Sequence, residues 1–201
     1  AVSGGENARG CLGLDLAGGR RLVPCRLERP AGMAPLDGWG ALSCGDAHSA
    51  CVTTQGALFT WGRGSGGQLG HGPSHLSDIL VPRPVVALEG LAVTQAVCGA
   101  AHTVVLCGTG DVYVFGTGKE EGAWPWNTQL SERLPSPAAA AGTPVRVQLY
   151  VQASNIAAAH HGVFIGYSSR STPAKIARHG GAKRRWMAAK ASLALAAAGP
   201  S

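Results

Sequence analysis

One stretch of this sequence occurs twice, and the spacing between the copies indicates a repeat architecture. The segment ALSCGDAHSACVTTQGALFTWGRG, which begins at Ala41, is matched by AVCGAAHTVVLCGTGDVYVFGTG, which begins at Ala96. Six residues have a counterpart 54 positions later without a gap: Cys44 and Cys98, Gly45 and Gly99, His48 and His102, Gly56 and Gly110, Phe59 and Tyr113, Gly62 and Gly116. A fixed period of this length is typical of chains in which one structural unit is copied.

Weaker matches extend the period in both directions. They pair residues 10–13 with 67–70, 23–24 with 81–82, 143–147 with 83–86, and 156–161 with 97–102. The last match places His161 at the repeat position of His48 and His102, with 54 positions between the first two histidines and 59 between the last two. The chain is therefore expected to open inside one unit, to contain two recognisable units and to end inside a third.

Within a unit the local signals predict β-structure. Residues 102–106 form a short apolar run, and residues 111–115 are rich in β-branched and aromatic side chains. The glycine-containing turn between them predicts a hairpin. Residues 62–70 are too rich in glycine for a helix or a long strand and predict a shaped loop. Such units bury their strands by stacking on neighbours, for example as small sheets arranged radially.

The order of these motifs resembles the regulator of chromosome condensation repeat. That repeat combines CGxxHT, GxVYxWG, GxxGQLGHG and P-x-x-V, and here its parts are residues 44–49, 56–62 and 67–72. The resemblance is strong from Trp39 to Gly118 and weaker over 5–29 and 144–167. It implies an all-β fold, a partial β-propeller of about three imperfect blades over residues 1–167, with a loop insertion at 119–143. The basic, alanine-rich tail, 168–201, is expected to be a short helix or disordered.

The length of 201 residues bounds the propeller. Seven blades, the usual number in the family, would need roughly 370 to 400 residues at this period. We therefore expect a fragment, a truncated product or a degenerate copy, and the start at Ala1 inside a repeat favours a missing N-terminal part.

Several residues are expected to be structural because they recur at one repeat position. Catalysis by His48, His102 and His161 would have to be repeated in every unit, so we expect them to hydrogen-bond backbone across the strand turn. The other positions expected to shape the repeat are Gly45, Gly56, Trp61, Gly62, Gly70, Gly99, Gly110 and Gly116. His71 and His75 have helical ligand spacing but stand in a Gly/Pro/Ser loop, where we expect them to be solvated.

No motif for catalysis, a cofactor or a metal is visible. The sequence has no P-loop, no nucleophile signature and no usefully spaced pair of carboxylates. Its six cysteines form no CxxC pair, which favours small buried thiols in a reducing compartment. No apolar run approaches the ~20 residues of a transmembrane helix, and no signal peptide is visible. The expectation is a cytoplasmic or nuclear protein that is not an enzyme, needs no cofactor and does not bind membranes.

The charge is divided along the chain. Residues 1–132 hold eight Lys and Arg against eleven Asp and Glu, a charge of −3, whereas residues 133–201 hold nine basic residues and no acidic one. The cluster Lys183-Arg184-Arg185 could make a weak nuclear-import, nucleic-acid or chromatin contact. A disordered, solvated tail or a mispredicted exon is the favoured alternative, because short basic clusters often occur by chance.

Trp124 and Trp126 are the candidate partner-binding residues. Exposed, they would be anchors for a protein partner, because Trp often dominates interface energy. Packing of both rings on a propeller edge is the favoured alternative, since large apolar rings are seldom left in water.

The resemblance leaves three functional classes. The first is a non-catalytic protein-interaction module, which can be one part of a larger protein such as a HECT-type ubiquitin ligase. The second is a guanine-nucleotide exchange factor for a Ran-type small GTPase, whose inserted wedge has no visible counterpart here. The third, a UV-B photoreceptor, carries GWRHT where this chain has 45–49 and 99–103, so its chromophoric Trp and its Arg are absent.

Overall fold

In a computed structural model of the chain, residues 1–15, 18–116, 142–147, 149, 152–158 and 163–167 are described. These residues are almost entirely β-structure, with one short 3-10 helix, η1 (Val86–Leu88). The strands are β1 (Val2–Glu6), β2 (Arg20–Arg26), β3 (Trp39–Cys44), β4 (His48–Thr53), β5 (Leu58–Gly62), β6 (Ile79–Pro84), β7 (Val93–Cys98), β8 (His102–Cys107), β9 (Val112–Gly116), β10 (Val145–Val147), β11 (Ala153–Ala158) and β12 (Val163–Tyr167).

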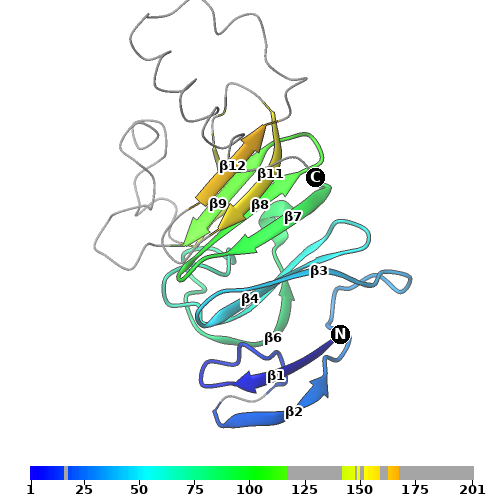
Figure 1. The fold of residues 1–201 in the computed structure, drawn as a ribbon, viewed down its shortest axis with the longest axis vertical. Coiled ribbons are helices and arrows are strands. Elements are labelled where there is room, and N and C mark those ends of the chain that lie inside the picture. The colour runs from blue at the N-terminus through cyan, green and yellow to red at the C-terminus, as the bar shows by residue number, and fades with distance from the viewer. Residues whose placement is uncertain (16–17, 117–141, 148, 150–151, 159–162, 168–201) are drawn as a thin grey trace, which may run out of the picture. The chain divides into compact units, whose positions relative to one another are not determined.

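The strands form four antiparallel sheets that follow one another in chain order (Figure 1). Strands β3 to β6 make one four-stranded sheet, blade 1, and β7 to β10 make a second, blade 2. Strands β1 and β2 pair as the N-terminal half-blade, and β11 and β12 pair as the C-terminal half-blade. The predicted all-β partial propeller is confirmed.

The repeat period is visible in the strand bounds. The first three strands of blade 1 begin at Trp39, His48 and Leu58. Those of blade 2 begin at Val93, His102 and Val112, each 54 positions later, which is the predicted period. The first strands of both blades have an irregularity at the same place, between Trp39 and Ala41 and between Val93 and Gln95. The two blades share one register because side chains alternate between the two faces of a strand, so equivalent buried residues require equivalent strand pairing.

Each half-blade copies a different half of a complete blade. The pairing of β1 with β2, including a register shift between Ser3 and Gly5, matches that of β5 with β6 between Thr60 and Gly62. The pairing of β11 with β12 matches that of β7 with β8. The described residues therefore hold the third and fourth strands of one blade, two complete blades, and the first and second strands of another.

The pairing corrects one predicted alignment. Ala158 pairs with Val163, as Cys98 pairs with Thr103, so Ala158 of the C-terminal half-blade is the counterpart of Cys98. The predicted alignment, which placed Ile156 on Val97, is one position out of step. Ile156 instead takes the position of Ala96, and both residues are buried. The apolar residues near Ile156 match the second repeat about equally well in the predicted alignment and in the one shifted by one position. Only the strand pairing distinguishes the two alignments.

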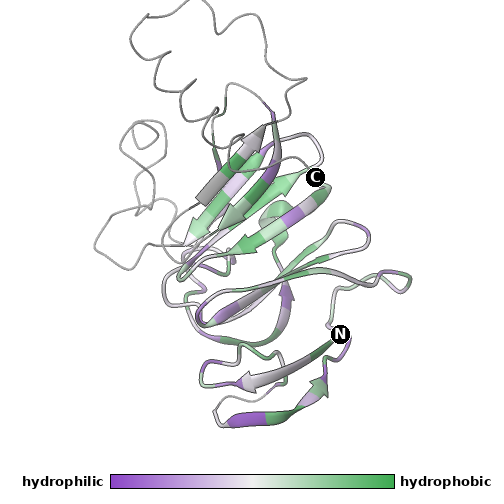
Figure 2. Cartoon of the chain, in the orientation of Figure 1, coloured by the Kyte–Doolittle hydropathy of each residue, from purple (hydrophilic) through white to green (hydrophobic). Residues whose placement is uncertain are grey.

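The core lies between successive blades. Strands β4, β5 and β8 are buried along their whole length, and β9 nearly so. Figure 2 shows many hydrophobic residues, in green, along β8 and β9. One apolar cluster joins Phe115 of blade 2 to Leu58 of blade 1, and another joins Val104 of blade 2 to Ile156 of the C-terminal half-blade. A third joins Leu27, after β2, to Phe59 of blade 1. Each sheet thus buries apolar area on its neighbour, as expected for stacked repeats.

Residues Ala1–Ser168 form one compact unit. Most of the predicted insertion, residues 119–141, and the whole tail, 168–201, lie outside the described residues. The described part of the chain contains no helix with the length and apolar character that crossing a bilayer requires.

Candidate protein-interaction surface

The repeated histidine position lies at the boundary between blades. The fully buried ring of His48 donates from Nε2 to Thr103 Oγ1 of blade 2 at 3.0 Å, and the Thr103 hydroxyl donates to the Gln68 carbonyl at 2.7 Å. Because the hydroxyl has one proton and gives it to Gln68, the His48 ring is the donor and carries its proton on Nε2. This relay ties β4, the loop after β5 and β8 together.

The His48 ring, expected to bond backbone across the strand turn, also reaches a side chain of the next blade, Thr103. Backbone bonds do close the predicted turns, from Gly45 N to His48 O and from Gly99 N to His102 O, both at 2.9 Å. The turn is therefore already satisfied without the ring, which is free to reach the next blade. The sequence held a signal for this contact, because a hydroxyl residue follows the histidine in both copies, Ser49 and Thr103.

Burial strongly disfavours the charged form of His48. Desolvation, and next the charge of a protonated His102, lower the pKa of His48 to about 4. The His48 Nδ1 atom is buried without a hydrogen-bond partner in the described structure. A proton added there would have no acceptor, which makes the neutral ring the stable form at neutral pH.

Gly45 and Gly99 are required by the histidine rings. A Cβ atom on Gly99 would lie 2.1 Å from Cε1 of His102, and one on Gly45 would lie 2.7 Å from Cε1 of His48 and 2.2 Å from the Gly99 carbonyl oxygen. No side chain fits in that space. The CGxxH motif therefore pairs a glycine with the ring that packs on it.

A second set of contacts recurs between blades with the same period. Ser49, at the position of Thr103, donates to the carbonyl of Cys11, at the position of Gln68, at 2.9 Å. The Trp61 indole N–H donates to the same carbonyl, also at 2.9 Å. Phe115, the counterpart of Trp61 in blade 2, packs against Gly70. A Cβ atom on Gly70 would lie 2.8 Å from the Phe115 ring. The glycines of the shaped loop thus receive the aromatic ring of the following blade.

The remaining repeat glycines close the hairpins and approach the next sheet. Gly56 and Gly110 have φ of 84° and 83°, and their carbonyls accept from Val93 N and Ala153 N, the first residues of the following sheets. Gly62 and Gly116 have φ near 100° and approach the backbone of the histidine strand. The structure therefore places these predicted residues at boundaries between blades.

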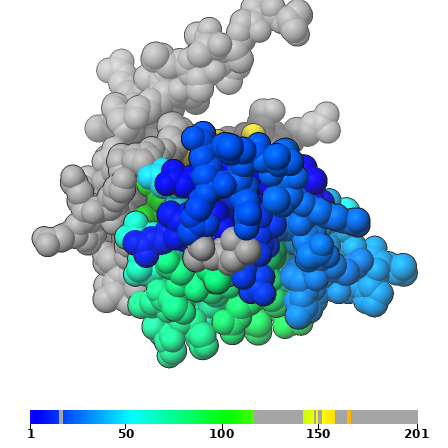
Figure 3. Space-filling view, turned by 90° about the horizontal axis from the view of Figure 1, so that it is seen from below, coloured from blue at the N-terminus to red at the C-terminus, as the bar shows by residue number. Residues whose placement is uncertain are grey.

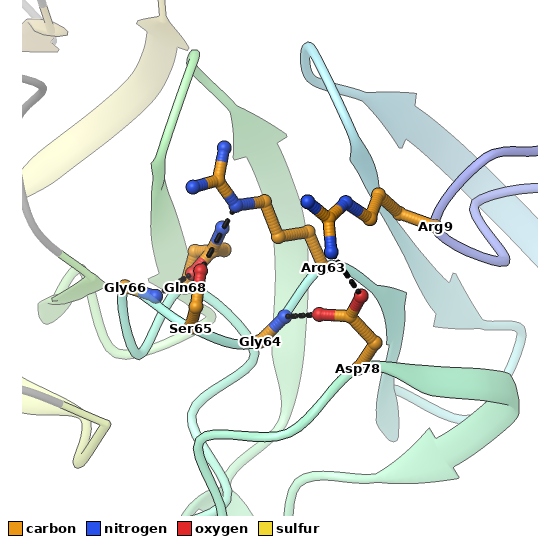
Figure 4. A network of polar contacts seen from close by, with 7 residues as sticks. All are labelled: Arg9, Arg63, Gly64, Ser65, Gly66, Gln68 and Asp78. Atoms are coloured by element: carbon orange, nitrogen blue, oxygen red, sulfur yellow. Dashed lines mark hydrogen bonds and ion pairs between the residues drawn. The ribbon is translucent and has the colours of Figure 1, made fainter.

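The loop between β5 and β6 is held by a polar network at one end of blade 1 (Figure 4). Asp78 Oδ1 accepts from Gly64 N at 3.1 Å, and its Oδ2 accepts from Arg9 of the preceding half-blade at 3.2 Å. Arg63 donates to Ser65 Oγ at 2.9 Å, and Gln68 Oε1 accepts from Gly66 N at 2.8 Å. Sequence reasoning missed Asp78, because a lone Asp in a loop carries no motif.

Arg63 and Arg9 are exposed at this end of the strands, which we call the loop rim; it comprises residues 7–15, 18–19, 45–47, 63–78 and 99–101. Gly142, the first described residue after the insertion, accepts from Gly72 N of this rim. The insertion connects β9 to β10, so it leaves and re-enters the described structure at the loop rim.

A shallow groove of about 350 Å³ lies at the opposite ends of the strands. Its lining comes from the β4–β5 turn and the connection around η1, with Leu58, Leu88 and Leu91 as apolar members and Gln55 and Glu89 as polar ones. This groove lacks clustered titratable groups, and the described residues hold no group of three or more His, Cys, Asp or Glu able to bind a metal ion.

Two expectations about other side chains need correction. His75 is exposed, but His71 is half-buried: its Nε2 lies 3.0 Å from Thr60 Oγ1, and burial lowers its pKa to about 4. All six cysteines are free, but Cys44 is exposed and Cys11 and Cys25 are only half-buried. Burial raises the pKa of Cys98 to about 12 and that of Cys51 to about 11, so these two thiols stay protonated.

Three of the predicted site residues, Trp124, Trp126 and His161, lie outside the described residues.

Comparison with protein families identifies the repeat. A model of the regulator of chromosome condensation (RCC1) repeat matches residues 55–106, and a second model of the same repeat matches residues 41–68. Residues 41–106 of this chain carry RCC1 repeats. The RCC1 matches coincide with blade 1 and the first half of blade 2.

Curated relatives share the RCC1 repeats over part of their length. The Caenorhabditis elegans X-linked retinitis pigmentosa GTPase regulator homolog is 45% identical over 108 residues, which are 50% of this chain and 8% of that protein. The human probable E3 ubiquitin-protein ligase HERC3 is 45% identical over 78 residues, 38% of this chain and 7% of that protein. The chain thus spans less than a tenth of either relative.

Solved structures show the same fold. Prp20p from Saccharomyces cerevisiae aligns with a TM-score of 0.63 over 84% of this chain and 40% of Prp20p, at 18% sequence identity. The similarity supports the propeller fold of this chain.

Proposed function

We propose that this chain is a non-catalytic protein–protein interaction module built from RCC1 repeats, and that its partner binds at the loop rim. The observation that carries the proposal is the use of the repeated polar residues. His48, Ser49 and Thr103 all bond across blade boundaries and leave no reactive group facing solvent. Such residues build a scaffold on which the variable loops make the contacts.

The loop rim is the part of the scaffold best suited to binding. Its backbone is held in place by Asp78 and Gln68, while the Arg63 side chain is exposed. A rigid loop loses little conformational entropy on binding, and Arg is enriched at interfaces. We assign the partner-binding role of Trp124 and Trp126 to the same rim, because the insertion that carries them joins β9 to β10 there.

The test is retention of a partner by the immobilised chain. We expect reproducible retention of one or more proteins from a cell lysate, identified by mass spectrometry, relative to a scrambled sequence of equal composition. Replacing Trp124 and Trp126 by Ala, or Arg63→Glu, should reduce retention at least about tenfold, the loss of one interface hot spot. Arg26→Glu is the matched control, because Arg26 is exposed at the end of β2 that lies opposite Val2, away from the rim.

Two results would contradict the proposal. One is a chain that shows a β-type circular dichroism spectrum yet retains nothing above the scrambled control. The other is a retained protein whose binding is unchanged by all of the rim substitutions.

A second candidate is guanine-nucleotide exchange on a Ran-type small GTPase. It is favoured by the shared fold with Prp20p, whose crystal structure was described together with its binding to Gsp1p and histones. An exchange factor acts by binding the nucleotide-free GTPase more tightly than the nucleotide-bound form. Faster release of labelled GDP from a Ran-type GTPase would support this function. An unchanged rate would exclude exchange on that GTPase and leave the interaction module as the remaining candidate.

Three further assignments depend on the relatives and on the tail. The similarity to HERC3 suggests that the chain could be the repeat module of a HECT-type ligase; the match spans 7% of HERC3. We propose a cytoplasmic or nuclear location, as for other intracellular scaffolds with free thiols. A nucleic-acid or chromatin contact through the basic tail stays a prediction, and salt-dependent DNA binding lost on replacing residues 183–185 by Ala would support it.

A further inference from the structure

The guanidinium group of Arg63 is held on one side and open on the other. Its Nε donates to Ser65 Oγ at 2.9 Å, and both residues are exposed on the loop rim. The terminal nitrogens, Nη1 and Nη2, make no hydrogen bond or ion pair with a residue that the structure describes. In Figure 4 they point away from the loop backbone and from Asp78. The bond from Nε therefore fixes the plane of a two-nitrogen fork whose outer edge faces solvent.

The acidic residue of the same polar network does not neutralise Arg63. Asp78 accepts from Gly64 N at 3.1 Å and pairs with Arg9 of the N-terminal half-blade at 3.2 Å. Figure 3 shows that half-blade, in dark blue, packed against blade 1, in light blue and blue-green, so the ion pair links two packed units. Because Arg9 takes the carboxylate of Asp78, the positive charge of Arg63 is left unbalanced within the network.

Arg63 stands at a position that the repeat does not fix. The pairing of β1 with β2 places Gly5 at the position of Gly62. Glu6 therefore takes the position of Arg63 in the N-terminal half-blade, and one period after Arg63 the sequence has Thr117. A positive, a negative and a neutral residue thus occupy equivalent positions, so the blade does not need the charge of Arg63. Exposed loop residues without a structural role are common carriers of binding function.

The charges of the loop rim favour a carboxylate over other oxyanions as a ligand for Arg63. Carboxylates and phosphate groups both match a guanidinium fork. The rim holds two Arg against three Asp, a charge of −1, whereas nucleic acids bind surfaces with clustered Lys and Arg. A phosphorylated side chain carries about −1.5 to −2 at neutral pH and would be repelled by these Asp residues. A carboxylate has one negative charge, which matches the single unbalanced charge of Arg63.

We infer that Arg63 binds one carboxylate of the partner protein, from an Asp or Glu side chain, through Nη1 and Nη2. The inference rests on the proposed function, because it names the chemical group of the partner that the loop rim recognises. Two parallel N–H···O bonds make such a pair directional. The bond to Ser65 orders the fork before the partner arrives, so less conformational entropy is lost on binding.

The first test uses the chain alone, with sodium acetate as the probe and NMR of its ¹⁵N-labelled arginine side chains as the readout. We expect saturable shifts of the Arg63 Nε–H and Nη–H signals, which Arg63→Lys assigns by their loss. Acetate should bind Arg63 at least about tenfold more tightly than Arg26, which is exposed on β2 without an Nε bond to a described residue. Sodium chloride at equal ionic strength corrects for screening.

A matched pair of serine variants tests the positioning of the fork. Ser65→Ala removes the acceptor of Arg63 Nε and should weaken acetate binding about fivefold, the loss of one hydrogen bond. Ser74→Ala, at another exposed serine of the same loop, should leave acetate binding unchanged. Both variants should keep the β-type circular dichroism spectrum, because neither serine is buried.

The second test uses a protein retained by the immobilised chain. Arg63→Lys keeps the charge but loses the planar fork, and it should reduce retention at least about fivefold. Retention that is unchanged in Arg63→Lys overturns the inference. So do acetate binding no tighter than at Arg26, equal weakening in Ser65→Ala and Ser74→Ala, or tighter binding of sodium phosphate than of acetate.

The two tests separate this inference from the proposed function, because the acetate titration needs no partner. A chain that binds acetate at Arg63 but retains no protein supports the carboxylate site and contradicts the interaction module. A chain that retains a protein but shows no preference of acetate for Arg63 supports the module and overturns the carboxylate site.

Discussion

At the residue scale, the repeat motif is a set of close contacts. His48 must be neutral to donate to Thr103 without burying a charge, and Gly45 and Gly99 must lack a Cβ atom for the rings to fit. These requirements explain why glycine and histidine recur together, and they make two substitutions informative.

The buried His48 should make stability depend on pH. Its pKa is about 4 in the folded chain and about 6.5 when unfolded, so between these values the unfolded chain binds the extra proton. Stability is therefore lost as pH falls below about 6.5, and the loss is complete near pH 4. Urea unfolding at pH 7 and pH 4.5 should show that His48→Gln removes about 2 to 3 kcal/mol of the pH-dependent loss.

Gln55→Asn is the control for this measurement, because Gln55 is an exposed turn residue without a titratable group. It should leave the difference between the two pH values unchanged. A His48→Gln chain with the full pH dependence of the original would show that other groups cause the acid sensitivity.

Gly99→Ala should destabilise the chain strongly. The new Cβ atom would lie 2.1 Å from His102 Cε1, so the ring or the strand turn has to move. Overpacking in a buried site typically costs about 1 to 3 kcal/mol. Thermal unfolding should show a lowered midpoint, whereas Gly108→Ala, with its nearest atom at 3.6 Å, should unfold within a few degrees of the original. Equal midpoints for both variants would contradict the predicted crowding.

At the element scale, apolar and polar contacts between blades hold neighbouring sheets together. The apolar clusters each join two sheets, and the histidine–threonine relay joins strand, loop and strand of two blades. The same physical requirement recurs wherever one blade meets the next. A buried backbone carbonyl of the shaped loop needs a donor, and the following blade supplies it.

Thr103→Val should weaken the boundary between blades 1 and 2. The valine keeps the shape but leaves His48 Nε2 and the Gln68 carbonyl without their partner. Leaving buried polar groups unsatisfied should cost about 2 to 3 kcal/mol in the free energy of unfolding. Thr94→Val, on the exposed side of β7, removes a hydroxyl that bonds only within its own blade and should cost less than about 1 kcal/mol. A larger effect of Thr94→Val would argue against the relay.

At the scale of the whole molecule, protection should fall from the complete blades toward the N-terminal half-blade. Strands β4, β5, β8 and β9 are buried on both faces, whereas Leu22 and Val23 of β2 are 82% and 72% exposed. Hydrogen exchange should therefore be slowest in the four inner strands and fastest in β2, because local opening needs less free energy where few apolar contacts are lost. Uniform exchange across all strands would contradict this gradient.

Much of this fold could be predicted from the sequence. The repeat period placed Gly45, Gly56 and Gly62 at turns whose copies recur in blade 2, because a turn with positive φ or close packing accepts little besides glycine. The alternation of apolar residues and glycines likewise predicted strands, since these are local requirements. The alignment of the third unit was off by one position, because Ile156 and its neighbours match either way until strand pairing fixes the register.

The sequence by itself determined that the unit is a small antiparallel sheet and that it repeats, because backbone conformation and strand burial depend mainly on residues close together in the chain. Only the tertiary structure decided the partners of those residues: that His48 bonds Thr103, and that His71 lies half-buried beside Thr60. The first contact joins two blades, and the second joins a strand to the loop that follows it. Their geometry exists only once the sheets are stacked.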